Sequence, residues 1–210
     1  MVRMICLLIV LLCQQSLAGN GNGNGSTPYL ENVFSTNLAG VRLQTEGDPF
    51  ASPVWELGSN NAPLVLHFDD FEGGYRPYTV RLVPCRRDWT PSDLFESQAF
   101  EGLDRELIQE HRPSFNTLQR YTHYSHPLPS ETLRPKISGN FAVLVYADQD
   151  LQDLVLVRRL LVLENRVSVA ALVRRTYAGR QALIHQQLEL DLTPGRLTIQ
   201  QPVQDLSLHV

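Results

Sequence analysis

Three carboxylates close together in the sequence are the best candidates for metal binding or for proton transfer. Asp69, Asp70 and Glu72 are followed directly by Gly73 and Gly74. Carboxylate oxygens suit Ca²⁺, and two carboxyl groups that face each other across a cleft can act as acid and base. Aspartate and glycine are also typical of tight turns. The primary interpretation is therefore a hairpin turn, with calcium binding or hydrolysis as the alternatives.

The histidines do not form a convincing reactive group. His123 and His126 are three residues apart, which on a strand places them on opposite faces, so they cannot converge on one metal ion. We interpret them as ordinary surface or rim histidines. His67 and Ser114 have no local group that would orient them as a nucleophile pair. The sequence has no Gly-x-Ser-x-Gly, Walker or His-Glu-x-x-His motif. We therefore predict no catalytic residues, no metal, no cofactor and no small-molecule substrate.

Polar and aromatic residues are unusually dense between Arg112 and Tyr124, and Asp88-Trp89 precedes them. Arginine and amphipathic aromatic residues dominate the cores of protein interfaces. One interpretation is an internal polar network that ties a long crossover to the fold. The other is a partner-binding surface, with the candidate residues Asp88, Trp89, Arg112, Phe115, Asn116, Tyr121 and Tyr124.

The elements that would position these residues are mostly strands. Residues 41–45, 64–68 and 78–82 alternate apolar and polar side chains, which indicates strands buried on one face. Residues 141–146 are apolar on both faces, and a short acidic turn joins them to the apolar run 154–163, which predicts a hairpin. The pattern predicts an all-β fold with an immunoglobulin-like β-sandwich over residues 36–164.

Two short helices are also possible within this domain. Thr90-Pro91-Ser92-Asp93 resembles a helix N-cap with proline at the first helical position. Leu103, Leu107 and Ile108 have a spacing compatible with a second short helix before Pro113.

A second β unit is predicted over residues 165–210. Residues 167–173 and 184–192 alternate, Pro194-Gly195 forms a turn, and the alternation of residues 206–210 continues to the last residue. A sheet that stops in this way has an unsatisfied edge, so we expect this second domain to be incomplete.

The N-terminus predicts export. Arg3, an apolar run and small residues at Ser16 and Ala18 are typical of a signal peptide over residues 1–18, and the run is too short for a membrane span. Lipidation at Cys13 is the alternative. Residues 19–35 begin with alternating glycine and asparagine and are expected to be a flexible leader. The mature chain keeps only Cys85, which we interpret as a small buried apolar residue.

Composition excludes several classes of protein. The chain has 210 residues, a formal net charge of −4, 43% hydrophobic and 19% charged residues. These values are typical of a globular protein that buries a core, and they exclude a disordered acidic tail. The chain also lacks the basic field that nucleic-acid binding needs.

Several motifs in order resemble the plug protein family of the type IX secretion system. They are CRRDWTPS at residues 85–92, SFNTLQRYTHY at 114–124, LRPKISGNF at 133–141 and LVRR at 156–159. The similarity extends from about residue 36 to the end of the chain. Family members continue past this endpoint, which agrees with the expectation of an incomplete second domain.

The resemblance implies a location and a task. Such a protein would lie in the periplasm, associated with the outer membrane. Its partner would be the large outer-membrane barrel translocon, whose periplasmic mouth it would seal without chemistry. The alternative is an immunoglobulin-like adhesion or glycan-binding module, in which Trp55, Trp89 or Tyr75 would stack on sugar rings.

Overall fold

The computed structural model describes residues 2–6, 27–45, 47–48, 50–58, 63–175, 186–195 and 200–201. Contacts divide the chain into two units, residues 23–164 and residues 1–22 together with 165–210. Most of the expected signal peptide and residues 19–26 of the expected leader lie outside the described residues. These assignments and the domain boundaries therefore stay predictions.

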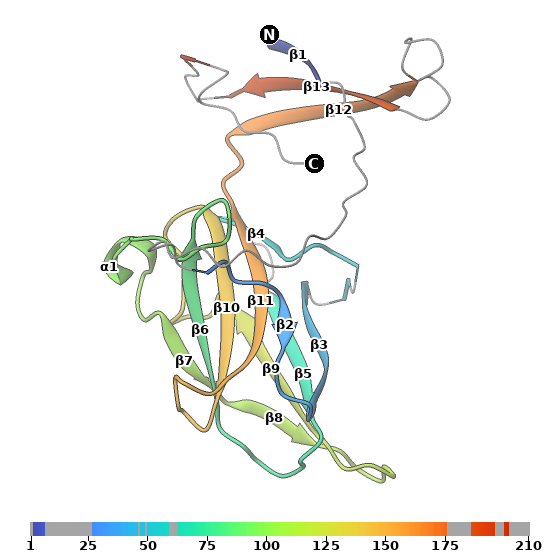
Figure 1. The fold of residues 1–210 in the computed structure, drawn as a ribbon, viewed down its shortest axis with the longest axis vertical. Helices are drawn as coiled ribbons and strands as arrows, with labels where there is room; N and C mark the ends of the chain where they lie inside the picture. The colour runs from blue at the N-terminus through green and yellow to red at the C-terminus, as the bar shows by residue number, and fades with distance from the viewer. Residues whose placement is uncertain are drawn as a thin grey trace. The chain divides into compact units, whose positions relative to one another are not determined.

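The larger sheet of the 23–164 unit has six strands, all antiparallel to their neighbours except one (Figure 1). Its pairing order is β2 (Asn32–Val33), β11 (Leu154–Leu163), β10 (Gly139–Ala147), β6 (Tyr78–Cys85) and β7 (Arg105–Ile108), with β4 (Val54–Glu56) parallel to β11. β2 lies in the segment expected as leader and pairs with Leu156 and Val157.

The smaller sheet of this unit has four antiparallel strands. Its order is β3 (Leu38–Thr45), β5 (Leu64–Asp70), β9 (Thr122–Leu128) and β8 (Glu110–Pro113). Only Gln109 separates β7 from β8, so the chain passes there from the edge of one sheet to the edge of the other. The loop between β8 and β9 projects from one end of this sheet (Figure 1).

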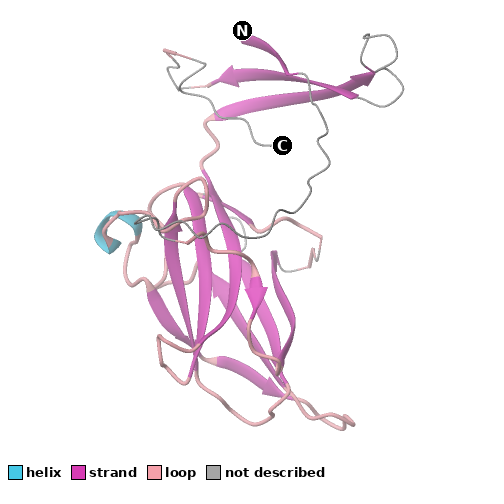
Figure 2. Ribbon diagram, in the orientation of Figure 1, coloured by secondary structure: helices cyan, strands magenta, loops and turns pink. Residues whose placement is uncertain are grey.

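Residues from both sheets form one apolar core, as expected for a sandwich. In β5 the buried residues alternate with half-buried ones, and Leu64, Leu66 and Phe68 all face inward, as the sequence pattern predicted. The all-β fold is confirmed, and Figure 2 shows strands throughout with a single short helix among the described residues.

Strand β10 is buried on both faces, which confirms the expectation from its continuous apolar run. Phe141, Val143 and Val145 pack into the core between the sheets. Leu144 and Tyr146 belong to a second cluster on the outer face of the larger sheet. β10 and β11 form the predicted hairpin, with Phe141 opposite Leu160.

Both helix predictions need correction. Residues 90–93 form no helix, and α1 (Glu96–Ala99) begins later, without the threonine cap. Residues 105–108 form strand β7, because pairing with β6 places Ile108 opposite Tyr78 and buries it. Tertiary pairing therefore overrides the local helical spacing there.

The acidic cluster is also not the turn that the sequence suggested. Asp69 and Asp70 are the last residues of β5. Of the three carboxylates, only Glu72 lies in the connection between β5 and β6. Asp70 is buried, where it accepts hydrogen bonds from the Tyr78 hydroxyl at 2.8 Å and from the Glu72 backbone N–H at 3.0 Å. The strand extends to these residues because their side chains find partners on both faces.

The other unit contains an antiparallel three-stranded sheet. Its order is β1 (Val2–Cys6), β13 (Gln186–Pro194) and β12 (Val167–Arg175). β1 lies within the expected signal peptide. In the part of the chain that the structure describes, no helix is long and apolar enough to span a bilayer.

Candidate functional site

The seven candidate partner-binding residues do not form one surface. Asp88 and Trp89 lie in the loop that follows β6, beside the N-terminal end of β10. The other five belong to β8, β9 and the loop between them, at the opposite end of the strands. Antiparallel pairing separates two segments that the sequence suggested might act together.

Asp88 stabilises its own turn. Its carboxylate accepts hydrogen bonds from the Thr90 backbone N–H at 3.1 Å and from the Thr90 hydroxyl at 2.6 Å. These bonds lower the pKa of Asp88. The residue is exposed, but its hydrogen-bonding capacity serves the loop.

Trp89 is half-buried and adopts a positive φ of 66° at the centre of this turn. The guanidinium of Arg159, on β11, lies 4.3 Å from the centre of its ring. This cation–π contact occupies one face of the indole. Together, Asp88 and Trp89 hold a long loop against the outer face of the larger sheet.

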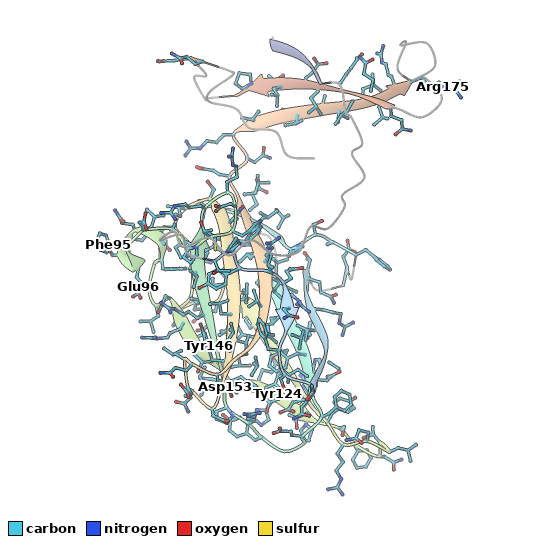
Figure 3. All side chains as sticks on the ribbon, viewed as in Figure 1. Phe95, Glu96, Tyr124, Tyr146, Asp153 and Arg175 are labelled. Carbon is cyan, nitrogen blue, oxygen red and sulfur yellow. The ribbon has the colours of Figure 1, made fainter. Side chains whose placement is uncertain are left out.

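Tyr124 lies in the core rather than on the surface. Figure 3 labels it toward the lower end of the sandwich. Its ring stacks on Phe68 at 5.1 Å and meets Tyr78 edge to face at 4.9 Å. Its hydroxyl donates to the Arg76 carbonyl at 2.9 Å and accepts from the Arg76 backbone N–H at 2.8 Å. Burial raises the pKa of Tyr124. This residue fixes the connection between β5 and β6.

We predict that Tyr124→Phe lowers the free energy of unfolding by about 1–2 kcal/mol, because both Arg76 backbone groups lose their partner. Urea unfolding followed by fluorescence measures the change. Tyr75→Phe is the matched control, since Tyr75 is exposed and should tolerate the same change within about 0.5 kcal/mol. Equal stability of the two variants would contradict the assigned role of Tyr124.

The loop between β8 and β9 is hydrogen-bonded to itself. Ser114 and Tyr121 close it through a backbone bond of 2.8 Å, and the Ser114 hydroxyl accepts from the Tyr121 N–H at 3.0 Å. The Thr117 hydroxyl contacts Ser114 Oγ at 3.0 Å and the Gln119 carbonyl at 2.8 Å. Asn116 has a positive φ of 54°, which this residue type tolerates well. These contacts define the shape of what we call the tip loop, residues 114–121.

The tip loop displays apolar side chains to solvent. Phe115 is 94% exposed and Leu118 is fully exposed. Tyr121 is half-buried and packs against Phe71 with ring centres 5.7 Å apart. Phe115 and Tyr121 are among the candidate residues predicted from the sequence, whereas Leu118 is not, because a leucine by itself does not indicate whether its side chain faces the core or solvent.

The connection between β5 and β6 lies against the base of the tip loop and supports it. The Thr122 hydroxyl donates to the Gly74 carbonyl at 2.6 Å. A hollow of about 510 Å³ lies between this connection and the tip loop, lined by residues that include Gly73, Asn116 and Arg120. The loop is therefore fixed at its base as well as by its internal bonds.

A second polar group, which the sequence analysis did not detect, lies where the two sheets meet. Glu106 Oε1 on β7 is 2.8 Å from His126 Nε2 on β9, and both side chains are largely buried. The atoms are close but are not aligned as a hydrogen bond. The interpretation of His126 as a surface or rim residue was wrong, because strand alternation turns it inward with Tyr124 and Leu128.

Polar neighbours keep Glu106 ionised despite its burial. Burial raises its pKa, but contacts from His126, Ser130 and Thr132 outweigh this effect and hold the pKa at about 2. These residues line an open groove of about 650 Å³ between β7 and β9. The polar side chains around the Glu106 carboxylate come from β9 and from the residues that follow it. We therefore assign Glu106 a structural role, which is to hold β7 of the larger sheet to β9 of the smaller sheet.

His123 faces the other side of β9 and forms a chain of polar contacts. Its Nδ1 lies 2.7 Å from Asp69 Oδ1, and its Nε2 lies 3.2 Å from His67 Nδ1. As expected, His123 and His126 do not converge. No cluster of metal-binding side chains occurs among the described residues.

The geometry gives little support to the alternative functions. The hydrolysis alternative pairs Asp69 or Asp70 with Glu72. The Glu72 side chain instead contacts Asn37 and Arg76, and Asp70 is buried against the Tyr78 hydroxyl, which gives no support to such a pair. Trp55 is buried, which removes it as a sugar-stacking platform, and Arg159 covers one face of half-buried Trp89. Cys85 is half-buried beside the outer cluster, and burial raises the pKa of its thiol.

A solved structure supports the fold. The chain is similar to a hypothetical protein from Parabacteroides merdae ATCC 43184, with a TM-score of 0.76 and 24% sequence identity. The match covers 84% of this chain and 44% of that one, so the present chain spans less than half the length of the similar structure. A comparison with curated proteins gives no significant match.

A family comparison identifies the sandwich. The model of the first domain of the type 9 secretion system plug protein matches residues 38–164, which contain every strand of the two sheets except β2. This family is a secretion-system family rather than an enzyme family, and it indicates a role in type IX secretion and a place in the cell envelope. The resemblance carried by the ordered motifs is confirmed: the chain belongs to the type 9 secretion system plug protein family.

Proposed function

We propose that this protein is a non-catalytic periplasmic plug. It binds the periplasmic mouth of the outer-membrane barrel translocon and closes it through reversible contact. The observation that carries this proposal is the family match over residues 38–164, which contain every strand of the sandwich except β2. The sandwich also has the solid apolar core that a stopper needs.

A seal of this kind needs no bound cofactor, nucleic acid or small-molecule substrate. It needs a stiff body and a contact that can be released, which favours a modest, partly polar interface. The proposal places the mature protein at the periplasmic side of the outer membrane after removal of residues 1–18. Of the candidate contact residues, Arg112, Phe115, Asn116 and Tyr121 remain available near or in the tip loop.

We predict that the tagged full-length protein, isolated from detergent-solubilised envelopes, co-purifies with an outer-membrane barrel of the type IX system. Mass spectrometry of the eluate identifies the partner. An unrelated tagged periplasmic protein of similar size provides the control. Recovery of polysaccharide without any barrel would contradict the plug assignment and favour the glycan-binding alternative.

A further inference from the structure

The tip loop combines exposed apolar side chains with a well-defined backbone. Phe115 and Leu118 lie three residues apart in the same loop, and both are almost completely exposed. Single exposed apolar residues are common on protein surfaces, but two at the end of a projecting hairpin form a small apolar patch. Such a patch indicates a binding site when the loop that carries it is ordered.

The loop is held in shape before any partner binds. The Ser114–Tyr121 closure and the two bonds of the Thr117 hydroxyl fix its backbone, and Thr122 ties its base to Gly74. Ordering a flexible loop on binding costs free energy, so a preformed loop binds more tightly with the same contacts. The apolar pair is thus presented in a fixed position.

Charge near the tip loop indicates the chemistry of its partner. Arg120 lies within the loop and is exposed, and Arg112 precedes it with an 80% exposed side chain. Glu110 offsets part of this charge through a contact of 3.3 Å with Arg112. The tip loop itself contains no carboxylate, and Glu72 in the adjacent connection is paired with Arg76 at 3.4 Å. Complementarity therefore favours a partner surface with acidic groups around an apolar depression.

We propose that the tip loop is the docking element of the plug, and this inference rests on the proposed function. Phe115 and Leu118 enter an apolar depression at the periplasmic mouth of the barrel translocon. Arg112 and Arg120 lie against carboxylates at the rim of that depression. Asp88, Trp89 and Tyr124 take no part in this contact, because they serve the fold.

The test is the affinity of the full-length protein for the purified barrel, measured by biolayer interferometry. The double variant Phe115→Ser/Leu118→Ser should bind about 100-fold more weakly or worse, since each buried apolar side chain contributes roughly tenfold or more. The matched control is Phe50→Ser. Phe50 is also 94% exposed, but it follows β3 at the opposite end of the smaller sheet. This control should bind like the wild type.

The outcomes separate the two proposals. Wild-type binding that persists in the double variant would overturn the docking role of the tip loop and leave the plug function in place. Equal losses in Phe50→Ser and in the double variant would also overturn it, since the effect would not be specific to the loop. Failure of the wild type itself to bind any barrel would overturn both proposals. Thermal unfolding of each variant confirms that the sandwich is folded.

The charged part of the proposal has its own test. Arg112→Glu/Arg120→Glu should weaken binding and should reduce the decrease in association rate that added salt causes. Unchanged affinity and salt dependence would overturn the acidic rim, whereas stronger binding would indicate a basic one.

Discussion

Replacement of Glu106 by alanine is expected to lower the free energy of unfolding by about 1–3 kcal/mol, the usual cost of leaving buried polar groups without their partner. Glu106 and His126 approach to 2.8 Å between the edge strand of the larger sheet and β9 of the smaller one. Without the carboxylate, His126 stays buried and loses the polar group that faces it. Thr132 and Ser130, which also contact Glu106, lose an acceptor as well.

Glu110→Ala provides the control for this prediction. Glu110 lines the same groove, but its side chain is 55% exposed and its one described ion pair is with exposed Arg112. Its removal should change stability by about 0.5 kcal/mol or less. Chemical denaturation of both variants at neutral pH tests the difference. A Glu106→Ala variant as stable as Glu110→Ala would show that the pair does not hold the sheets together.

Glu106 should also make the free energy of unfolding depend on pH in the acidic range. The pKa of Glu106 is about 2 in the folded protein, below its ordinary value of 4.5. A lowered folded pKa contributes stability that is fully present above the unfolded value and is lost as the pH falls from about 4.5 to about 2. The difference corresponds to roughly 3 kcal/mol. Glu106→Gln should lack this part of the acid dependence, and an unchanged pH profile would contradict it.

Strand patterns were readable from the sequence where one face of a strand is buried. The alternation of β5 and the double-sided apolar run of β10 predicted burial correctly, because each reflects contacts that every residue of the strand makes. The spacing around Leu107 instead suggested a helix. Its strand form depends on pairing with β6, whose residues lie some distance away in the sequence, and local patterns contain no such information.

The candidate site was predictable only in part. Composition identified the region between Arg112 and Tyr124, but it could not separate Phe115, which is exposed, from Tyr124, which is buried. Tyr124 is buried because β9 begins at Thr122 and its alternation turns Tyr124 inward, whereas Phe115 lies before the strand. The start of β9 was not evident from the sequence. The place of Trp89 at the other end of the strands was not predictable either. A high density of polar and aromatic residues along the sequence does not indicate where in a sandwich those residues lie.

The fold explains how a docking loop could be held in place. Tyr124 lies in β9, the strand that follows the tip loop, and its hydroxyl binds the backbone of Arg76, while Asp70 accepts a hydrogen bond from the Tyr78 hydroxyl. The aromatic cluster of Phe68, Tyr78 and Tyr124 thus supports the end of the sandwich that carries Phe115 and Leu118. In the proposed function, this support would keep the tip loop in a fixed position on the sandwich when it docks.

The most direct test of the proposed seal is the ionic conductance of the purified translocon in a planar lipid bilayer. A barrel that is open enough to export folded proteins should conduct strongly when its periplasmic mouth is empty. Addition of the full-length plug from the periplasmic side should reduce the current nearly to that of the bare bilayer, and the Phe115→Ser/Leu118→Ser variant should fail to do so at the same concentration. A current that stays unchanged after saturating wild-type protein is added would contradict the account.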